Sequence, residues 1–162
     1  MKSTDLITRE FINSHDACLS GENWFVQNFP NGGEYQKVLD ALVEQDHTDW
    51  ASWLMSIAGA SDEVREIEGD LKAKSYYFCG SLRVSGLISV ELRLQAGSGI
   101  KAGSGIEAGS DYGIFAALRL RLSLWAEQGR VIAKEQPKNL KTGVYVPLEP
   151  VPVDADPIAM GR

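Results

Sequence analysis

The sequence AGSGIKAGSGIEAGS, at residues 96–110, contains the same six-residue unit twice, with a lysine in the first copy where the second has a glutamate. Steps of six residues from Ile100 and Ile106 reach an apolar residue every time. These residues are Tyr76, Leu82, Ile88 and Leu94 on one side, and Tyr112, Leu118 and Leu124 on the other. Such a regular period predicts an architecture built of repeating units.

The same region alternates between apolar and polar residues with period two. From Leu82 to Ala108 nearly every even-numbered residue is apolar or small, whereas the odd-numbered residues carry the charges. Strict alternation indicates β-strands, but three residues between Gly-Ser-Gly triplets are too few for a hairpin meander of ordinary strands. Short strands joined by glycine corners predict a β-solenoid instead. A flexible linker is the alternative, and the regular isoleucines and alanines argue against it.

Glycine and serine have predicted roles at the corners. We expect the glycines to supply unusual backbone angles and the serines to stack in a polar ladder. The glycines are Gly97, Gly99, Gly103, Gly105 and Gly109, and the serines are Ser98, Ser104 and Ser110.

This stretch resembles the hexapeptide-repeat β-helices, whose loose pattern is an aliphatic residue, a small or acidic one, two free positions and a small residue. Residues 106–110, IEAGS, fit that pattern, and residues 100–104, IKAGS, depart from it at the second position. The stretch is also similar to the polymer-forming bactofilin-type β-helices. The hexapeptide resemblance implies that three units close one coil, which gives about three coils.

Helices are predicted before the repeat. The first ends near Asn13, a second runs from a Ser14 cap to Gly21, a third spans 34–45, a fourth runs from Thr48 to Gly59, and a short acidic one covers 62–68. The predicted fold is therefore α+β, with a helical head at residues 1–70 that caps a short parallel β-helix at residues 71–135. Residues 136–162 are expected to hold an edge strand and a proline-rich tail. Val131 to Ala133 and Val144 to Val146 are the expected edge strands at the far end.

Charge divides the chain of net charge −6 into two unlike parts. Residues 1–70 hold fourteen acidic and four basic residues, a net charge of −10, whereas residues 71–162 hold eight acidic and twelve basic. An acidic head disfavours direct nucleic-acid binding and favours a basic partner, by imitation of nucleic acid. The alternative is a solvated face that aids solubility.

The chain has no run of about 18 apolar residues and no signal-peptide core, so we expect a cytoplasmic protein that binds no membrane. Cys18 and Cys79 are expected to be free, mostly buried thiols. His15 and Cys18 share a helix face in the predicted second helix, but a metal site with His47 would need further ligands.

The resemblance to hexapeptide-repeat proteins implies an acyltransferase with a histidine base, yet residues 71–162 contain no histidine. No phosphate-binding loop, nucleophile elbow or carboxylate cluster is present either. We therefore expect a binding protein with no cofactor and no metal. An enzyme with a pocket between the head and the first coil is the third alternative.

An aromatic, acidic head (WFVQNFP at 24–30, WASWLM at 50–55) precedes the Gly-Ser-Gly repeats, and in this the chain resembles small uncharacterised proteins of bacterial prophages and mobile elements. That resemblance implies a phage-borne inhibitor in the host cytoplasm that binds a host protein or nucleoprotein complex of antiviral defence, as anti-CRISPR proteins do. The candidate binding residues of the head are Asp40, Glu44, Asp46 and Asp49. Those of an outward solenoid row are Arg83, Arg93, Lys101, Glu107, Asp111, Arg119 and Arg121. A self-assembling scaffold, with a second copy of the chain as partner, is the alternative.

Overall fold

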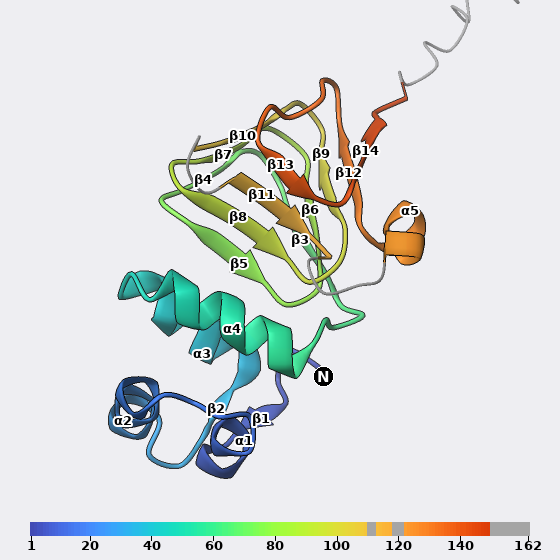
Figure 1. The fold of residues 1–162 in the computed structure, drawn as a ribbon. Helices are drawn as coiled ribbons and strands as arrows, with labels where there is room; N and C mark the ends of the chain where they lie inside the picture. The colour runs from blue at the N-terminus through green and yellow to red at the C-terminus, as the bar shows by residue number, and fades with distance from the viewer. Residues whose placement is uncertain (110–112, 118–121, 150–162) are drawn as a thin grey trace, which may run out of the picture.

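The computed structural model describes residues 1–109, 113–117 and 122–149 (Figure 1). The head contains β1 (Leu6–Ile7), α1 (Arg9–Asn13), α2 (Leu19–Asn28), β2 (Gly33–Glu34), α3 (Tyr35–Glu44) and α4 (Thr48–Ala58). The solenoid strands are β3 (Val64–Ile67), β4 (Leu71–Ala73), β5 (Tyr76–Phe78), β6 (Ser81–Val84), β7 (Ile88–Val90), β8 (Arg93–Ala96), β9 (Ile100–Ala102), β10 (Ile106–Ala108), β11 (Gly113–Ala116), β12 (Arg130–Ala133), β13 (Leu140–Thr142) and β14 (Val144–Pro147). The predicted α+β fold, a helical head that caps a parallel β-helix, is confirmed.

The solenoid has three parallel sheets and about four turns. Sheet 1 has the order β14-β12-β9-β6-β3, sheet 2 the order β10-β7-β4, and sheet 3 the order β13-β11-β8-β5. Each of the first three coils gives one strand to each sheet, and partners in adjacent coils lie 18 residues apart where Leu82 pairs with Ile100 and Ile88 with Ile106. Three units of six residues therefore close a coil there, as expected.

Apolar residues of the period-two pattern fill the solenoid. The buried interior consists of Leu82, Val84, Ile88, Val90, Leu94, Ala96, Ile100, Ala102, Ile106, Ile114, Ala116, Val131 and Ala133. The even-numbered pattern holds up to Ala108, and Ile114 then aligns with Leu94, 20 residues away. Further on, Leu124 lies in a 3-10 helix (Leu122–Leu124) followed by α5 (Trp125–Gln128), so the six-residue steps do not continue into that segment. Tyr112 and Leu118 lie outside the described residues.

The corner glycines differ from expectation in their reason. None of the five predicted corner glycines has a positive φ. A Cβ on Gly97 would lie 1.9 Å from the carbonyl oxygen of Cys79, and one on Gly103 would lie 1.9 Å from that of Ser85. The glycine that opens each corner is therefore required by the close approach of the backbone one coil below, since any side chain would collide with it.

Two helix predictions were wrong. Ser14 ends α1, and the next helix starts at Leu19 because Cys18 caps it, with Sγ accepting from the Gly21 N–H at 3.4 Å. Residues 62–68 contain strand β3, whose exposure alternates as in a strand. Arg65 of β3 lies over the ring of Phe78 at 4.4 Å and donates to the Tyr76 hydroxyl at 2.9 Å, so the first coil buries an arginine stem where the sequence suggested a helix.

The head covers the first coil in two layers, with α3 and α4 against the solenoid and α1 and α2 outside them (Figure 1). The buried side chain of Gln36 completes the free edge of β5: its amide donates to the Tyr77 carbonyl at 2.8 Å, and its oxygen accepts from the Cys79 N–H at 3.1 Å. Gln36 thus takes the place of the next strand.

A second tie joins the N-terminus to the solenoid. The N–H and hydroxyl of Ser3 donate to Glu63 at 2.6 and 2.9 Å, and the Ser61 hydroxyl donates to the same carboxylate at 2.6 Å. These hydrogen bonds, that from Ser61 first, hold the pKa of Glu63 below its usual value.

The solenoid strands extend from Val64 to Pro147. β3 therefore lies inside the segment predicted as head, and β13 and β14 lie beyond residue 135. The two predicted edge strands are present as β12 and β14. Among the described residues, no helix is long and apolar enough to cross a membrane.

Candidate functional site

The four predicted acidic residues of the head lie along one edge. Asp40 and Glu44 are one turn apart on α3, Asp46 follows that helix, and Asp49 is in the first turn of α4. All four are exposed. We call this set the acidic edge.

Part of the acidic edge is engaged within the molecule. Asp46 forms an ion pair with Lys74 at 2.5 Å, and Asp40 accepts a hydrogen bond from Gln36 at 2.8 Å. Glu44 and Asp49 form no ion pair with any residue that the structure describes. Their charges are therefore free to meet a partner.

The predicted outward row of the solenoid is divided among three sheets. Arg83 and Lys101 are neighbours on sheet 1, and Arg83 pairs with Glu66 at 3.3 Å. Glu107 lies on sheet 2, and Arg93, on sheet 3, stacks on the Phe115 ring at 3.8 Å. The described members of this row therefore do not form a single surface. Asp111, Arg119 and Arg121 lie outside the described residues.

Arg83 and Lys101 do border an open groove of about 610 Å³ on the face of sheet 1. Its other charged residues are Asp62, Glu127 and Arg130. The groove therefore mixes both signs of charge, and it offers no single-signed surface to a ligand.

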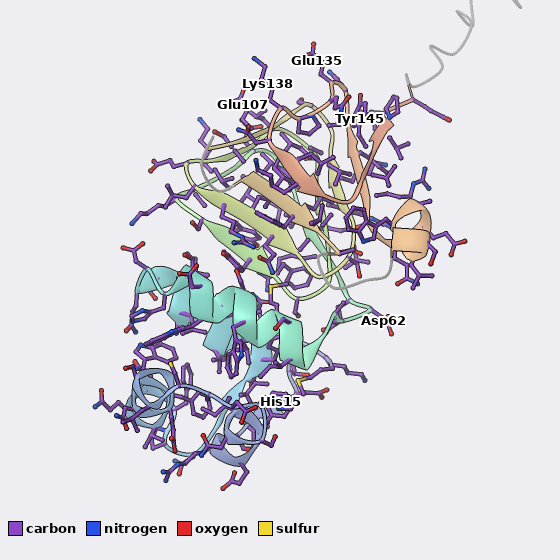
Figure 2. All side chains as sticks on the ribbon, in the orientation of Figure 1. His15, Asp62, Glu107, Glu135, Lys138 and Tyr145 are labelled. Atoms are coloured by element: carbon purple, nitrogen blue, oxygen red, sulfur yellow. The ribbon has the colours of Figure 1, made fainter. Side chains whose placement is uncertain are left out.

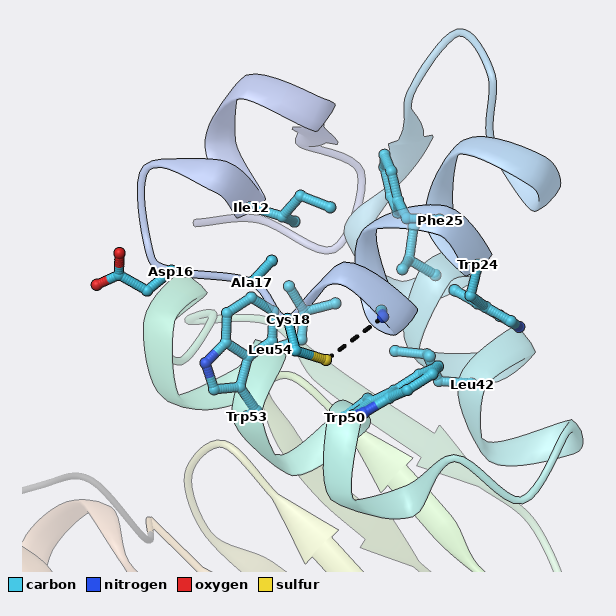
Figure 3. A pocket seen from close by; sticks show the side chains of 12 residues that line it. Ile12, Asp16, Ala17, Cys18, Trp24, Phe25, Leu42, Trp50, Trp53 and Leu54 are labelled. Atoms are coloured by element: carbon cyan, nitrogen blue, oxygen red, sulfur yellow. Dashed lines mark hydrogen bonds between the residues drawn. The ribbon is translucent and has the colours of Figure 1, made fainter.

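A hollow of about 310 Å³ lies in the head between α2 and α4 (Figure 3), and we call it the tryptophan hollow. Its lining residues are Ile12, Asp16, Ala17, Cys18, Gly21, Trp24, Phe25, Val38, Leu42, Trp50, Trp53 and Leu54. This volume is at the lower end of the range for small-ligand pockets. The sequence assigned these tryptophans to the core, because helical spacing identifies a buried stripe but does not show whether the stripe is filled.

The walls of the tryptophan hollow are held by contacts outside it. The Trp24 Nε1–H donates to the Gln45 side-chain oxygen at 2.8 Å. The rings of His47 and Trp50 stack with centroids 4.3 Å apart, and Trp24 meets Trp50 edge-on at 6.4 Å. These contacts fix the aromatic rings in place, so the hollow is preformed.

The titratable groups near the hollow are dispersed. His15 follows α1 and packs on Phe11, whereas Cys18 caps α2, so the predicted shared helix face is wrong. Among the described residues, no three His, Cys, Asp or Glu side chains are placed to hold a metal. Cys18 is exposed, contrary to expectation, and Cys79 is buried, which raises the pKa of its thiol to about 11. Burial also raises the pKa of Tyr35. The arrangement of apolar walls and separate titratable groups suits binding.

Fold and site together define a short β-solenoid capped by an acidic helical head with an aromatic hollow. A protein-family model described as the YdhT N-terminal domain matches residues 1–58, which is the head up to the last residue of α4. The Escherichia coli (strain K12) protein described as "Uncharacterized protein YdhT" is 46% identical over 35 residues, which are 22% of this chain and 13% of that protein. The match thus spans about an eighth of the length of that relative. No solved structure matches the chain.

Proposed function

We propose that this is a non-enzymatic binding protein whose acidic edge docks on a basic protein surface of the kind that holds nucleic acid. The observation that carries the proposal is the exposure of Asp40, Glu44, Asp46 and Asp49 along one edge of a head that has net charge −10 over residues 1–70. Complementary charge speeds association and selects basic partners.

The finer part of the proposal concerns the target. A host defence complex of the CRISPR type is the partner we propose, and the support is the resemblance to prophage-borne proteins together with the negative charge of the head. In such a complex a nucleic-acid channel would provide the basic surface. The solenoid then serves as a rigid support for the head.

A capture experiment with charge-reversed variants tests the proposal. The tagged protein and the double variant Asp40→Lys/Glu44→Lys are incubated with nuclease-treated bacterial lysate and washed at increasing salt. We expect the natural protein to retain a nucleic-acid-handling complex at low salt, and the variant to lose it. Equal retention by the two proteins would remove the acidic edge from the proposal.

The matched control is Glu107→Lys/Glu135→Lys, which reverses two exposed charges on the solenoid away from the head (Figure 2). Because Asp40 contacts Gln36, the single variant Glu44→Lys separates charge from folding. Its thermal unfolding is measured beside its binding.

A self-assembling scaffold is the second candidate. Strands β10, β13 and β14 end their sheets, and no further described strand covers them. Sedimentation over a range of concentrations tests this function: a strictly monomeric protein at high concentration would contradict it. Pro147 speaks against it, since this residue of β14 has no N–H to offer to another strand.

A further inference from the structure

The tryptophan hollow and the acidic edge belong to the same small head. We propose that the hollow anchors one large apolar side chain of the partner, from a segment in which lysine or arginine flanks that side chain. This inference rests on the proposed function, because it specifies which part of a basic partner the head holds.

The shape of the hollow supports an anchor site. Its volume of about 310 Å³ exceeds the roughly 150 Å³ of an apolar cavity that holds benzene, so a leucine or an aromatic side chain can enter. The wall rings are fixed by the Trp24–Gln45 hydrogen bond and the stacking of His47 on Trp50, so they do not have to be ordered on binding.

The side chains around the hollow leave it open. Leu19, next to the lining residue Cys18, is 72% exposed, and does not fill the hollow. Cys18 itself is tied to the start of α2 through its bond to the Gly21 N–H (Figure 3). An apolar group from a partner would remove the exposed apolar lining from water.

Charge determines what flanks that apolar group. Residues 1–58 hold nine acidic and three basic residues. Two of the three basic residues are engaged within the head, Arg9 with Glu22 at 2.8 Å and Lys37 with Glu34 at 3.0 Å. Asp16 lies at the outer rim of the hollow with its carboxylate directed away from the rings (Figure 3). Cations beside the anchor are therefore attracted, and anions are repelled.

Three synthetic peptides test the inference on the intact protein. The first has a leucine between two pairs of lysines, the second replaces the leucine by serine, and the third replaces the lysines by glutamates. Dissociation constants are measured by NMR titration. We expect the first peptide to bind about ten-fold or more tightly than the second, from burial of the leucine side chain. We also expect it to bind more tightly than the third, by a factor that falls with added salt.

Closing the hollow supplies the matched variants. Gly21 lines the hollow inside α2, and a Cβ there would meet the Cys18 Sγ at 3.4 Å, an ordinary contact. Gly21→Leu fills the hollow and favours the helix, while Gly21→Ala adds one methyl group and leaves most of the space. We expect Gly21→Leu to lower the affinity for the leucine peptide to that for the serine peptide, and Gly21→Ala to preserve most of the difference. Asp16→Asn, which tolerates the positive φ of 60° at this position, should reduce the preference for lysine.

Each other outcome contradicts the inference. Equal binding of the leucine and serine peptides, or unchanged leucine-peptide binding by a folded Gly21→Leu variant, would remove the anchor site. The charge-reversal experiment on the acidic edge would still decide the proposed function separately. A preference for leucine with no preference for lysine over glutamate would overturn the basic partner segment.

Discussion

The side chain of Gln36 performs a task that usually belongs to a whole strand. It is 6% exposed, and it bonds a carbonyl and an N–H on the free edge of β5. Buried backbone groups that lose their partners cost more than the bond itself contributes, because water cannot replace the partner. The junction of head and solenoid therefore depends strongly on one amide.

Gln36→Leu should lower the free energy of unfolding by about 2–4 kcal/mol, because it leaves the Tyr77 carbonyl and the Cys79 N–H unpaired in an apolar setting. Denaturant unfolding followed by circular dichroism measures the loss. The control is Gln128→Leu, an exposed glutamine of α5, where we expect a change within about 0.5 kcal/mol. Equal unfolding midpoints for the two variants would contradict this role of Gln36.

Cys79 predicts a loss of stability at alkaline pH. Burial, and next the charge of Glu63, raise the pKa of its thiol to about 11 from an ordinary value near 9. Since the folded state then holds a proton that the unfolded state releases between about pH 9 and 11, stability is complete below pH 9 and falls above it. We expect Cys79→Ala to remove roughly 1–2 kcal/mol of the loss between pH 8.5 and 10.5. Denaturant unfolding at both pH values checks this, and identical losses in the two proteins would contradict it.

At the scale of the coil, two glycines of one repeat have different importance. A Cβ on Gly103 would lie 1.9 Å from the Ser85 carbonyl oxygen, whereas one on Gly105 would lie 3.4 Å from the side chain of Leu87. Gly103→Ala must therefore push adjacent coils apart, at a cost of about 2–3 kcal/mol. Gly105→Ala should change stability by no more than about 0.5 kcal/mol. Thermal unfolding of both variants measures the difference, and similar losses would show that the corners are not packed this tightly.

The solenoid could be predicted from the sequence because its period is local and strict. Every inward residue from Leu82 to Ala108 could be assigned from alternation alone, and the stripe Val38, Leu39 and Leu42 located α3. The insertion that carries α5 could not, because the six-residue steps still reached the apolar Leu124. Residues 62–68 were taken for a helix because four of the seven are acidic, while the strand partner that decides their structure lies 17 residues away.

The candidate site was less predictable than the fold. The acidic edge follows from helical spacing, since Asp40 and Glu44 are four residues apart. The tryptophan hollow depends on how two helix pairs meet, and sequence spacing does not contain that information. The outward row failed as a single surface because its residues belong to three sheets, which only the lengths of the coils determine.

At the scale of the whole molecule, the two ends of the solenoid are protected differently. The head buries Tyr77, Phe78 and Cys79 of the first coil, all at 3% exposure or less. At the other end (Figure 2), β14 contains Pro147, which cannot donate a hydrogen bond to an added strand. The first coil relies on the head, and the last coil carries its own obstacle to pairing.

Removal of the head should therefore cause association. A chain that begins at Gly59 exposes the edges of β3, β4 and β5 together with the apolar residues of the first coil, and such an edge pairs readily with another copy. We expect light scattering to show a mass of at least a dimer that rises with concentration, under conditions in which the intact chain has a lower mass. Tyr145→Pro in the shortened chain, which removes an N–H from β14 at the opposite end, should not prevent this association, because it proceeds through the first coil. A shortened chain that remains folded and monomeric would show that the head is not required to protect that end.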